Sequence, residues 1–232
     1  MSGISTWQTI LNGFDFSYLL SILLSVIPSL LCITLHELSH GLVAYKLGDP
    51  TAKNAGRLTL NPLKHLDPVG LLMLVAFHVG YAKPVPVNMY RFKNPKRGMA
   101  VTALAGPLSN VVIAVVFLFL YGLAAAPLGG SAAGKYLLRM LNLTATISIG
   151  YAIFNMLPIP PLDGSKVLLA VLSDEGYQRL MRYERYGSLL LLALVWGGVL
   201  GRPLSAAISA VYELLFPIAQ GGYTFSQVLF YR

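Results

Sequence analysis

The chain has 232 residues, of which 56% are hydrophobic and only 11% are charged, and its mean hydropathy is +0.66. This composition excludes an ordinary soluble domain and predicts an integral membrane protein. The formal net charge of +8 could suggest a nucleic-acid partner. The basic residues form no stripe interleaved with aromatic side chains, however, so we expect no nucleic-acid binding.

Apolar runs predict an all-α polytopic membrane protein with four to five transmembrane helices in a single domain, residues 1–232. No Lys or Arg precedes the first run and no small-residue cleavage site follows it, so we expect it to be retained. Cys32 is the only cysteine, which excludes an intrachain disulfide. The runs are Phe16–Leu35, Gly98–Pro127, Leu141–Leu157, Tyr186–Gly201 and Leu204–Pro217.

The distribution of basic residues predicts the orientation in the membrane. Nine of the 17 Lys and Arg lie between Lys46 and Arg97, whereas none lies in residues 1–45 or 98–134. The positive-inside rule therefore places the loop after the first helix in the cytoplasm, and Arg182 and its neighbours mark a second cytoplasmic loop. We expect the N-terminus outside and a multi-pass protein of the cell membrane.

The segment Gly56–Asn88 is too polar at both ends to span the membrane. Its apolar middle, Val69–Val79, suits a short re-entrant piece. The flanks "GRLTL" and "KPVPV" alternate side chains as strands do, and the prolines of the second favour an edge strand. We therefore expect a small membrane-associated β-sheet beside a cavity.

The stretch "LHELSHG" places ionisable groups inside an apolar helix. His36 and His40 are four residues apart and project from one face, with Glu37 beside them. Two neighbouring imidazoles can hold Zn²⁺, and an adjacent carboxylate can accept a proton from a metal-bound water. Buried ionisable groups in a membrane are costly, which favours a functional role.

A catalytic zinc needs a third protein ligand, and the stretch "NMLPIPPLDG" supplies the favoured candidate. Its prolines forbid a continuous helix, so the chain should open between about Leu157 and Leu162. Asp163 follows this break in apolar surroundings, where a metal would supply the missing charge. The other candidates are Cys32, His65, Asp67 and His78, and for each a role other than metal binding is favoured. We expect Cys32 to be a small buried residue, His65 and Asp67 to be surface or cap residues, and His78 to be an interfacial residue.

The motifs "HELSHG", "GRLTLNP", "KPVPV", "AGPLSN" and "NMLPIPPLDG" occur in the order seen in the site-2 protease family of intramembrane zinc metalloproteases, peptidase family M50. The chain resembles a minimal core of that family, without PDZ or CBS domains. The resemblance implies one Zn²⁺ held by His36, His40 and Asp163, Glu37 as the catalytic base, and Asn155 in contact with the substrate.

The resemblance also implies a zinc metalloendopeptidase that hydrolyses peptide bonds in or near transmembrane segments of membrane proteins in the lipid bilayer. We expect the active site to be reached from the cytoplasmic side. The alternative is a zinc or proton transporter that uses the same His and Asp cluster without hydrolysis. In the "AGPLSN" motif, Gly106, Pro107 and Asn110 favour a kink with close helix packing over direct substrate contact.

Overall fold

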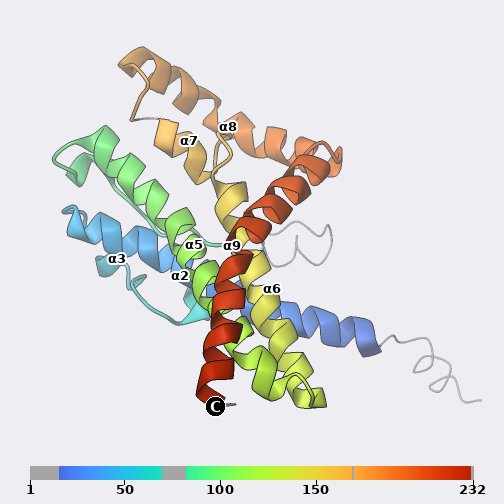
Figure 1. The fold of residues 1–232 in the computed structure, drawn as a ribbon. Helices are drawn as coiled ribbons and strands as arrows, with labels where there is room; N and C mark the ends of the chain where they lie inside the picture. Colours follow the sequence, from blue (N-terminus) through green and yellow to red (C-terminus); the bar gives the residue numbers. More distant parts are fainter. Residues whose placement is uncertain (1–15, 69, 71–81, 169, 231–232) are drawn as a thin grey trace, which may run out of the picture.

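The computed structural model describes residues 16–68, 70, 82–168 and 170–230. This part of the chain is mainly helical (Figure 1). The α-helices are α2 (Phe16–Lys46), α3 (Thr51–Asn54), α5 (Pro95–Leu128), α6 (Ala132–Asn155), α7 (Asp163–Leu168), α8 (Asp174–Trp196) and α9 (Gly201–Phe230), and the 3-10 helices are η1 (Pro62–Lys64) and η2 (Met89–Arg91).

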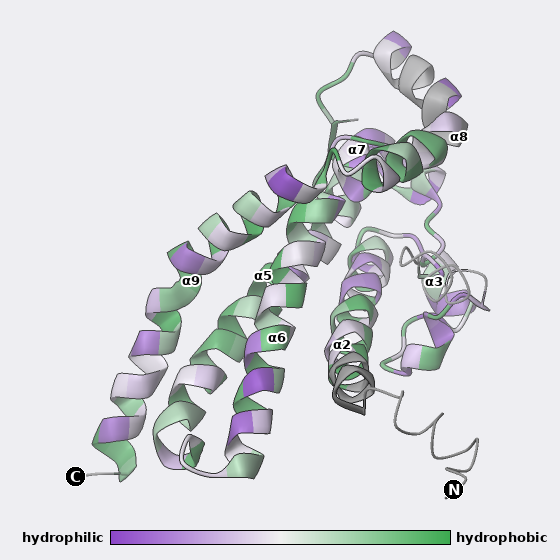
Figure 2. Ribbon diagram, turned by 90° about the vertical axis from the view of Figure 1, so that its right-hand side faces the viewer, coloured by the Kyte–Doolittle hydropathy of each residue, from purple (hydrophilic) through white to green (hydrophobic). Residues whose placement is uncertain are grey.

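Four of these helices are long and apolar enough to cross a membrane: α2 from Leu24 onward, α5, α6 and α9. The chain is thus a multi-pass membrane protein, and the four candidate spans of the described residues match the lower end of the predicted range. The expected span Tyr186–Gly201 is wrong, because its helical part ends at Trp196 and its apolar portion is too short to cross. Both views place α8 beside α7 at one end of the bundle (Figures 1 and 2).

Helix α5 is the centre of the bundle and packs against α2, α6 and α9. Small residues permit close approach, since a Cβ on Gly122 of α5 would overlap the backbone of Ala219 in α9. Leu118 and Ala145 are fully buried at the same packing centre. Many large apolar side chains of the spans are exposed, as expected for lipid contact.

The expected β-sheet does not form in the described residues, which contain only one isolated antiparallel bridge, between Leu66 and Ala82. The backbone of the "KPVPV" segment bonds elsewhere. The Val85 amide donates to the Glu37 carboxylate, and the Asn88 amide donates to Asp49. Pro84 and Pro86 carry no amide hydrogen, so a regular ladder has too few donors. The proposed re-entrant piece, residues 69–79, lies outside the described residues apart from residue 70.

The break between α6 and α7 forms as the prolines predict: α6 ends at Asn155 and α7 begins at Asp163. The Pro160–Pro161 peptide bond is cis. The chain folds back tightly here, because a Cβ on Gly164 would lie 2.5 Å from the carbonyl oxygen of Leu157. Only glycine fits at this position, directly after the aspartate. The break therefore packs the start of α7, which carries Asp163, closely against the residues that follow α6.

Candidate metal centre

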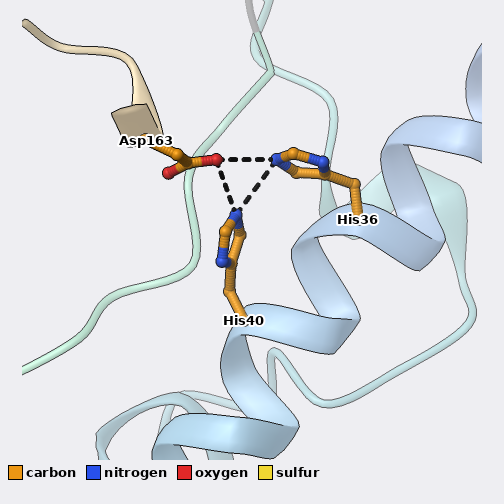
Figure 3. A group of neighbouring side chains, drawn as sticks. All are labelled: His36, His40 and Asp163. Carbon is orange, nitrogen blue, oxygen red and sulfur yellow. Dashed lines mark hydrogen bonds and ion pairs between the residues drawn. The ribbon is translucent and has the colours of Figure 1, made fainter. Parts of the chain in front are cut away.

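Three side chains from two distant parts of the chain converge in the bundle (Figure 3). The Nε2 atoms of His36 and His40 lie 3.0 Å apart, and Asp163 Oδ2 lies 3.1 Å from each of them. His36 and His40 are one turn apart on α2, whereas Asp163 opens α7. Their donor atoms lie within 4.8 Å of one another, so the group could hold a metal ion.

The three side chains lie inside the protein. His36, His40 and Asp163 are 7%, 8% and 7% exposed. Burial raises the pKa of the Asp163 carboxyl, but its contacts with the two imidazoles outweigh burial and hold this pKa well below its ordinary range. Helix α5, which contacts both α2 and α7, holds the two elements in register. A buried carboxylate of this kind requires positive charge nearby.

Each side chain of the group also has a contact on its outer side. The carbonyl oxygen of Thr102 accepts a hydrogen bond of 2.7 Å from His40 Nδ1. The side-chain amide of Asn110 lies 3.2 Å from His36 Nδ1. Lys166 Nζ lies 3.8 Å from Asp163 Oδ1, the oxygen that faces away from the imidazoles. These contacts orient the inner atoms Nε2, Nε2 and Oδ2 toward one another.

Gly106 brings the α5 backbone against the two imidazoles. A Cβ at this position would lie 2.6 Å from His36 Nε2 and closer still to His40 Nε2. Glycine is the one residue type without that atom, so it is required for this approach. The close packing predicted for Gly106 therefore has a specific partner, the candidate metal centre.

Glu37 lies beside the histidines on α2. Its Oε2 accepts a hydrogen bond of 2.7 Å from the Val85 amide, which ties the 83–87 segment to the helix. Asn155 is the last residue of α6, and its side-chain amide donates to the carbonyl oxygen of Tyr151 at 3.0 Å. Asn155 is not a member of the metal group, and its predicted contact with a substrate stays a prediction.

Comparison with known proteins identifies the family. Residues 122–196 match the family model described as Peptidase family M50. The protein named "Putative zinc metalloprotease YwhC" of Bacillus subtilis is 35% identical over 205 residues, which are 84% of this chain and 92% of the relative. This chain belongs to peptidase family M50.

Further relatives of this M50 peptidase carry similar names. "Putative zinc metalloprotease Rip2" of Mycolicibacterium smegmatis is 32% identical over 194 residues, which are 80% of this chain and 71% of the relative. "Zinc metalloprotease MJ0392" of Methanocaldococcus jannaschii is 29% identical over 192 residues, which are 82% of this chain and 45% of the relative. No solved structure matches the chain.

Among the described residues, the other candidate ligands Cys32, His65 and Asp67 are not members of the metal group of the M50 peptidase. Cys32 is fully buried, as expected of a small packing residue. Asp67 accepts from the Gly70 amide in a cap-like contact, as expected. His65 is the C-cap residue of η1, one of the two positions expected for it, and it is fully buried with Nε2 3.0 Å from the Thr59 carbonyl oxygen. His78 lies outside the described residues.

Sequence reasoning missed four contacts of the centre, one of them the approach of Lys166 to Asp163. It assigned no role to the Thr102 carbonyl or the Val85 amide, because backbone groups leave no signal in residue identity. It treated Asn110 only as a helix-packing residue, although a buried amide in an apolar span requires polar partners. That requirement was the one signal that could have indicated a contact with the histidines.

Proposed function

We propose that this M50 peptidase is a zinc metalloendopeptidase that hydrolyses peptide bonds in or near transmembrane segments of other membrane proteins. One observation carries the proposal: His36, His40 and Asp163 meet at a helix long and apolar enough to cross a membrane. Glu37 stands next to the first histidine on that helix. The names of the relatives support zinc and proteolysis, and the position within a membrane span supports membrane-embedded substrates.

The donor set fits one zinc ion. A catalytic zinc takes three protein ligands and keeps one position open, and imidazole nitrogens with a carboxylate oxygen are among its usual ligands. Ligands at 2.0–2.1 Å in a tetrahedron are spaced about 3.3 Å apart. The spacings of 3.0 Å and 3.1 Å between the donor atoms are close to that value. His36 and His40 would bind through Nε2 and Asp163 through Oδ2.

The residues around the ion would divide the chemistry of hydrolysis among them. When bound, zinc lowers the pKa of a water molecule and polarises the substrate carbonyl. The Glu37 carboxylate would accept a proton from the attacking water and later return it to the leaving amine. Because the Val85 amide holds Oε2, we assign the proton transfer to Oε1 of Glu37.

Two further elements would hold the substrate. Asn155 has a second amide hydrogen besides the one given to Tyr151, and we assign it to the substrate backbone or the developing oxyanion. A helical substrate must unwind before attack, and carbonyl oxygens of the 84–87 segment would accept hydrogen bonds from the amides that unwinding exposes. Helix-breaking residues near the cleavage site should therefore favour hydrolysis.

Cleavage of transmembrane peptides tests the proposal. Purified protein in detergent is incubated with a panel of transmembrane peptides that carry Gly or Pro near the middle, and products are identified by mass spectrometry. Glu37→Gln should keep one zinc and lose at least about 100-fold in rate, the size of a general-base contribution. Glu213→Gln on α9 makes the same chemical change on an exposed residue and should cleave normally. Unchanged cleavage by Glu37→Gln would overturn the assigned base, and zinc uptake into liposomes without hydrolysis would establish the transporter.

Metal content tests the ligands separately from activity. His36→Ala, His40→Ala and Asp163→Ala should each lose tightly bound zinc, because only two of three protein ligands remain. His65→Ala removes a buried histidine outside the group and should keep one zinc per chain. Wild-type zinc affinity in Asp163→Ala would refute the assignment of the third ligand.

We propose that the active site is reached from the cytoplasmic side, because the positive-inside rule places the basic loops there. Cysteine labelling tests this orientation. In a Cys32→Ala background, a cysteine at Lys53 should react with an impermeant maleimide only from the cytoplasmic side. A cysteine at Ala133, in the first turn of α6, should react only from the opposite side. Both positions are exposed. The reverse pattern would invert the proposed topology.

A further inference from the structure

We propose that Asn110 is a positioning residue for His36: its side-chain carbonyl accepts the Nδ1 hydrogen of His36 and thereby leaves Nε2 free to bind the metal. The inference rests on the zinc site of the proposed function. It concerns the outer side of that site, where α5 meets α2, and it assigns a specific hydrogen-bonding role to a residue of the "AGPLSN" motif.

The inner geometry dictates which nitrogen of each imidazole carries hydrogen. Both Nε2 atoms face Asp163 Oδ2, so Nε2 is the nitrogen that would bind zinc. A metal-binding nitrogen needs its lone pair, and a neutral imidazole then carries its hydrogen on Nδ1. For His40 the protein enforces this tautomer directly, because a carbonyl oxygen can only accept and the Thr102 carbonyl lies 2.7 Å from Nδ1.

His36 faces an amide in place of a carbonyl. The Nδ2 atom of Asn110 lies 3.2 Å from His36 Nδ1. With zinc on Nε2, this orientation would set two hydrogen-bond donors against each other. Asn110 is fully buried, and its Oδ1 has no hydrogen-bond partner in the described part of the chain. An unpaired buried acceptor of this kind is costly.

Exchanging the oxygen and nitrogen of the Asn110 amide resolves both conflicts. The two groups have nearly the same size, and rotation of the amide changes the hydrogen bonding with little change in packing. Oδ1 then faces His36 Nδ1 and gains the partner that it lacked. The Nδ1 hydrogen of His36 in turn gains an acceptor, as His40 has in Thr102. Both histidines would then be oriented by acceptors on α5.

The main chain at Asn110 has a separate anchor. Ser148 Oγ of α6 donates a hydrogen bond of 2.8 Å to the Asn110 carbonyl oxygen. This contact concerns the packing of α5 on α6 and leaves the side-chain amide unaltered. Ser148→Ala is therefore a matched control, since it removes a buried hydrogen bond at the same residue without changing the acceptor for His36.

The test compares zinc affinities, measured by competition with a chromogenic chelator, and the visible spectrum of the Co²⁺-loaded protein. Asn110→Leu keeps the volume and removes the acceptor, so zinc affinity should fall by about 10- to 100-fold and the Co²⁺ bands should change. Asn110→Asp restores an acceptor for Nδ1 and should bind zinc within a few-fold of wild type. Ser148→Ala should resemble wild type in both measurements.

Two results would overturn the inference: wild-type zinc affinity in Asn110→Leu, or an equal loss in Asn110→Leu and Asn110→Asp, which would show a role in packing alone. Asn110→Ala takes the place of Asn110→Leu if the larger side chain prevents folding. His36→Ala separates this inference from the proposed site. If His36→Ala loses zinc and Asn110→Leu does not, only the role of Asn110 fails; if His36→Ala keeps zinc, the site itself fails.

Discussion

Replacing Gly106 by alanine should expel the metal while the helices stay in place. The added Cβ would lie 2.6 Å from His36 Nε2, whereas ordinary van der Waals contact begins at 3.4 Å. The methyl group is thus about 0.8 Å too close, the difference between these two distances, and it is closer still to His40. Zinc ligands keep their distances within about 0.2 Å, so the imidazoles cannot move aside that far and retain the ion.

We expect the zinc affinity of Gly106→Ala to fall at least about 100-fold, which corresponds to about 2.7 kcal/mol. Chelator competition measures the affinity, and peptide cleavage should fall in parallel. Gly150→Ala on α6 is the matched control, because its Cβ would meet only Ile208 Cδ1 at 3.5 Å. Both changes raise helix propensity equally. Wild-type zinc affinity in Gly106→Ala would refute the close approach of α5 to the histidines.

Three other changes probe the surroundings of the centre. Val85→Pro removes the amide that donates to Glu37, so kcat should fall about tenfold with zinc content unchanged. Val85→Ala keeps the amide and should retain kcat. An equal loss of kcat in both variants would show that packing, not the hydrogen bond, is responsible. Gly164→Ala should lower zinc affinity in chelator competition, because its Cβ would lie 2.5 Å from a carbonyl oxygen of the preceding break and displace the adjacent ligand; unchanged affinity would contradict this. Burial raises the pKa of Asp49, but hydrogen bonds from Thr51 and the neighbouring loop outweigh burial and hold this pKa below its ordinary range. The ionised carboxylate therefore stabilises the fold above about pH 4, and this contribution is lost as pH falls through the lower pKa of the folded state. Asp49→Ala should therefore lower the free energy of unfolding by about 2 kcal/mol at pH 7, as measured by denaturant titration. The difference from wild type should shrink in acid, and a constant difference would refute the assignment.

The sequence predicted those parts of the structure that depend on local geometry. Proline cannot continue a helix, so the break before Asp163 is found where it was expected. Residues four apart on a helix share a face, so His36 and His40 lie side by side. The expected span after Tyr186 failed because apolar composition measures hydrophobicity and does not fix where a helix ends.

The expectations for the loops failed for a different reason. The "KPVPV" segment has the alternation of a strand, but its amide at Val85 bonds to Glu37 instead of a neighbouring strand. The loop after it is held by Asp49, also from outside the segment. In both cases the partner is distant in sequence, and periodicity within a segment carries no information about such partners.

By itself, the sequence determined a membrane-embedded helical protein with two histidines and a carboxylate on one helix and a favoured third ligand beyond a proline break. These features follow from hydrophobicity, helical periodicity and the missing amide of proline, all of which act over a few residues. Only the tertiary structure decided that Asp163 meets both histidines at 3.1 Å, that Gly106 closes one side of the group, and that Asn110 faces His36. Such contacts depend on how α5 packs between α2 and α7, which is a property of the whole bundle.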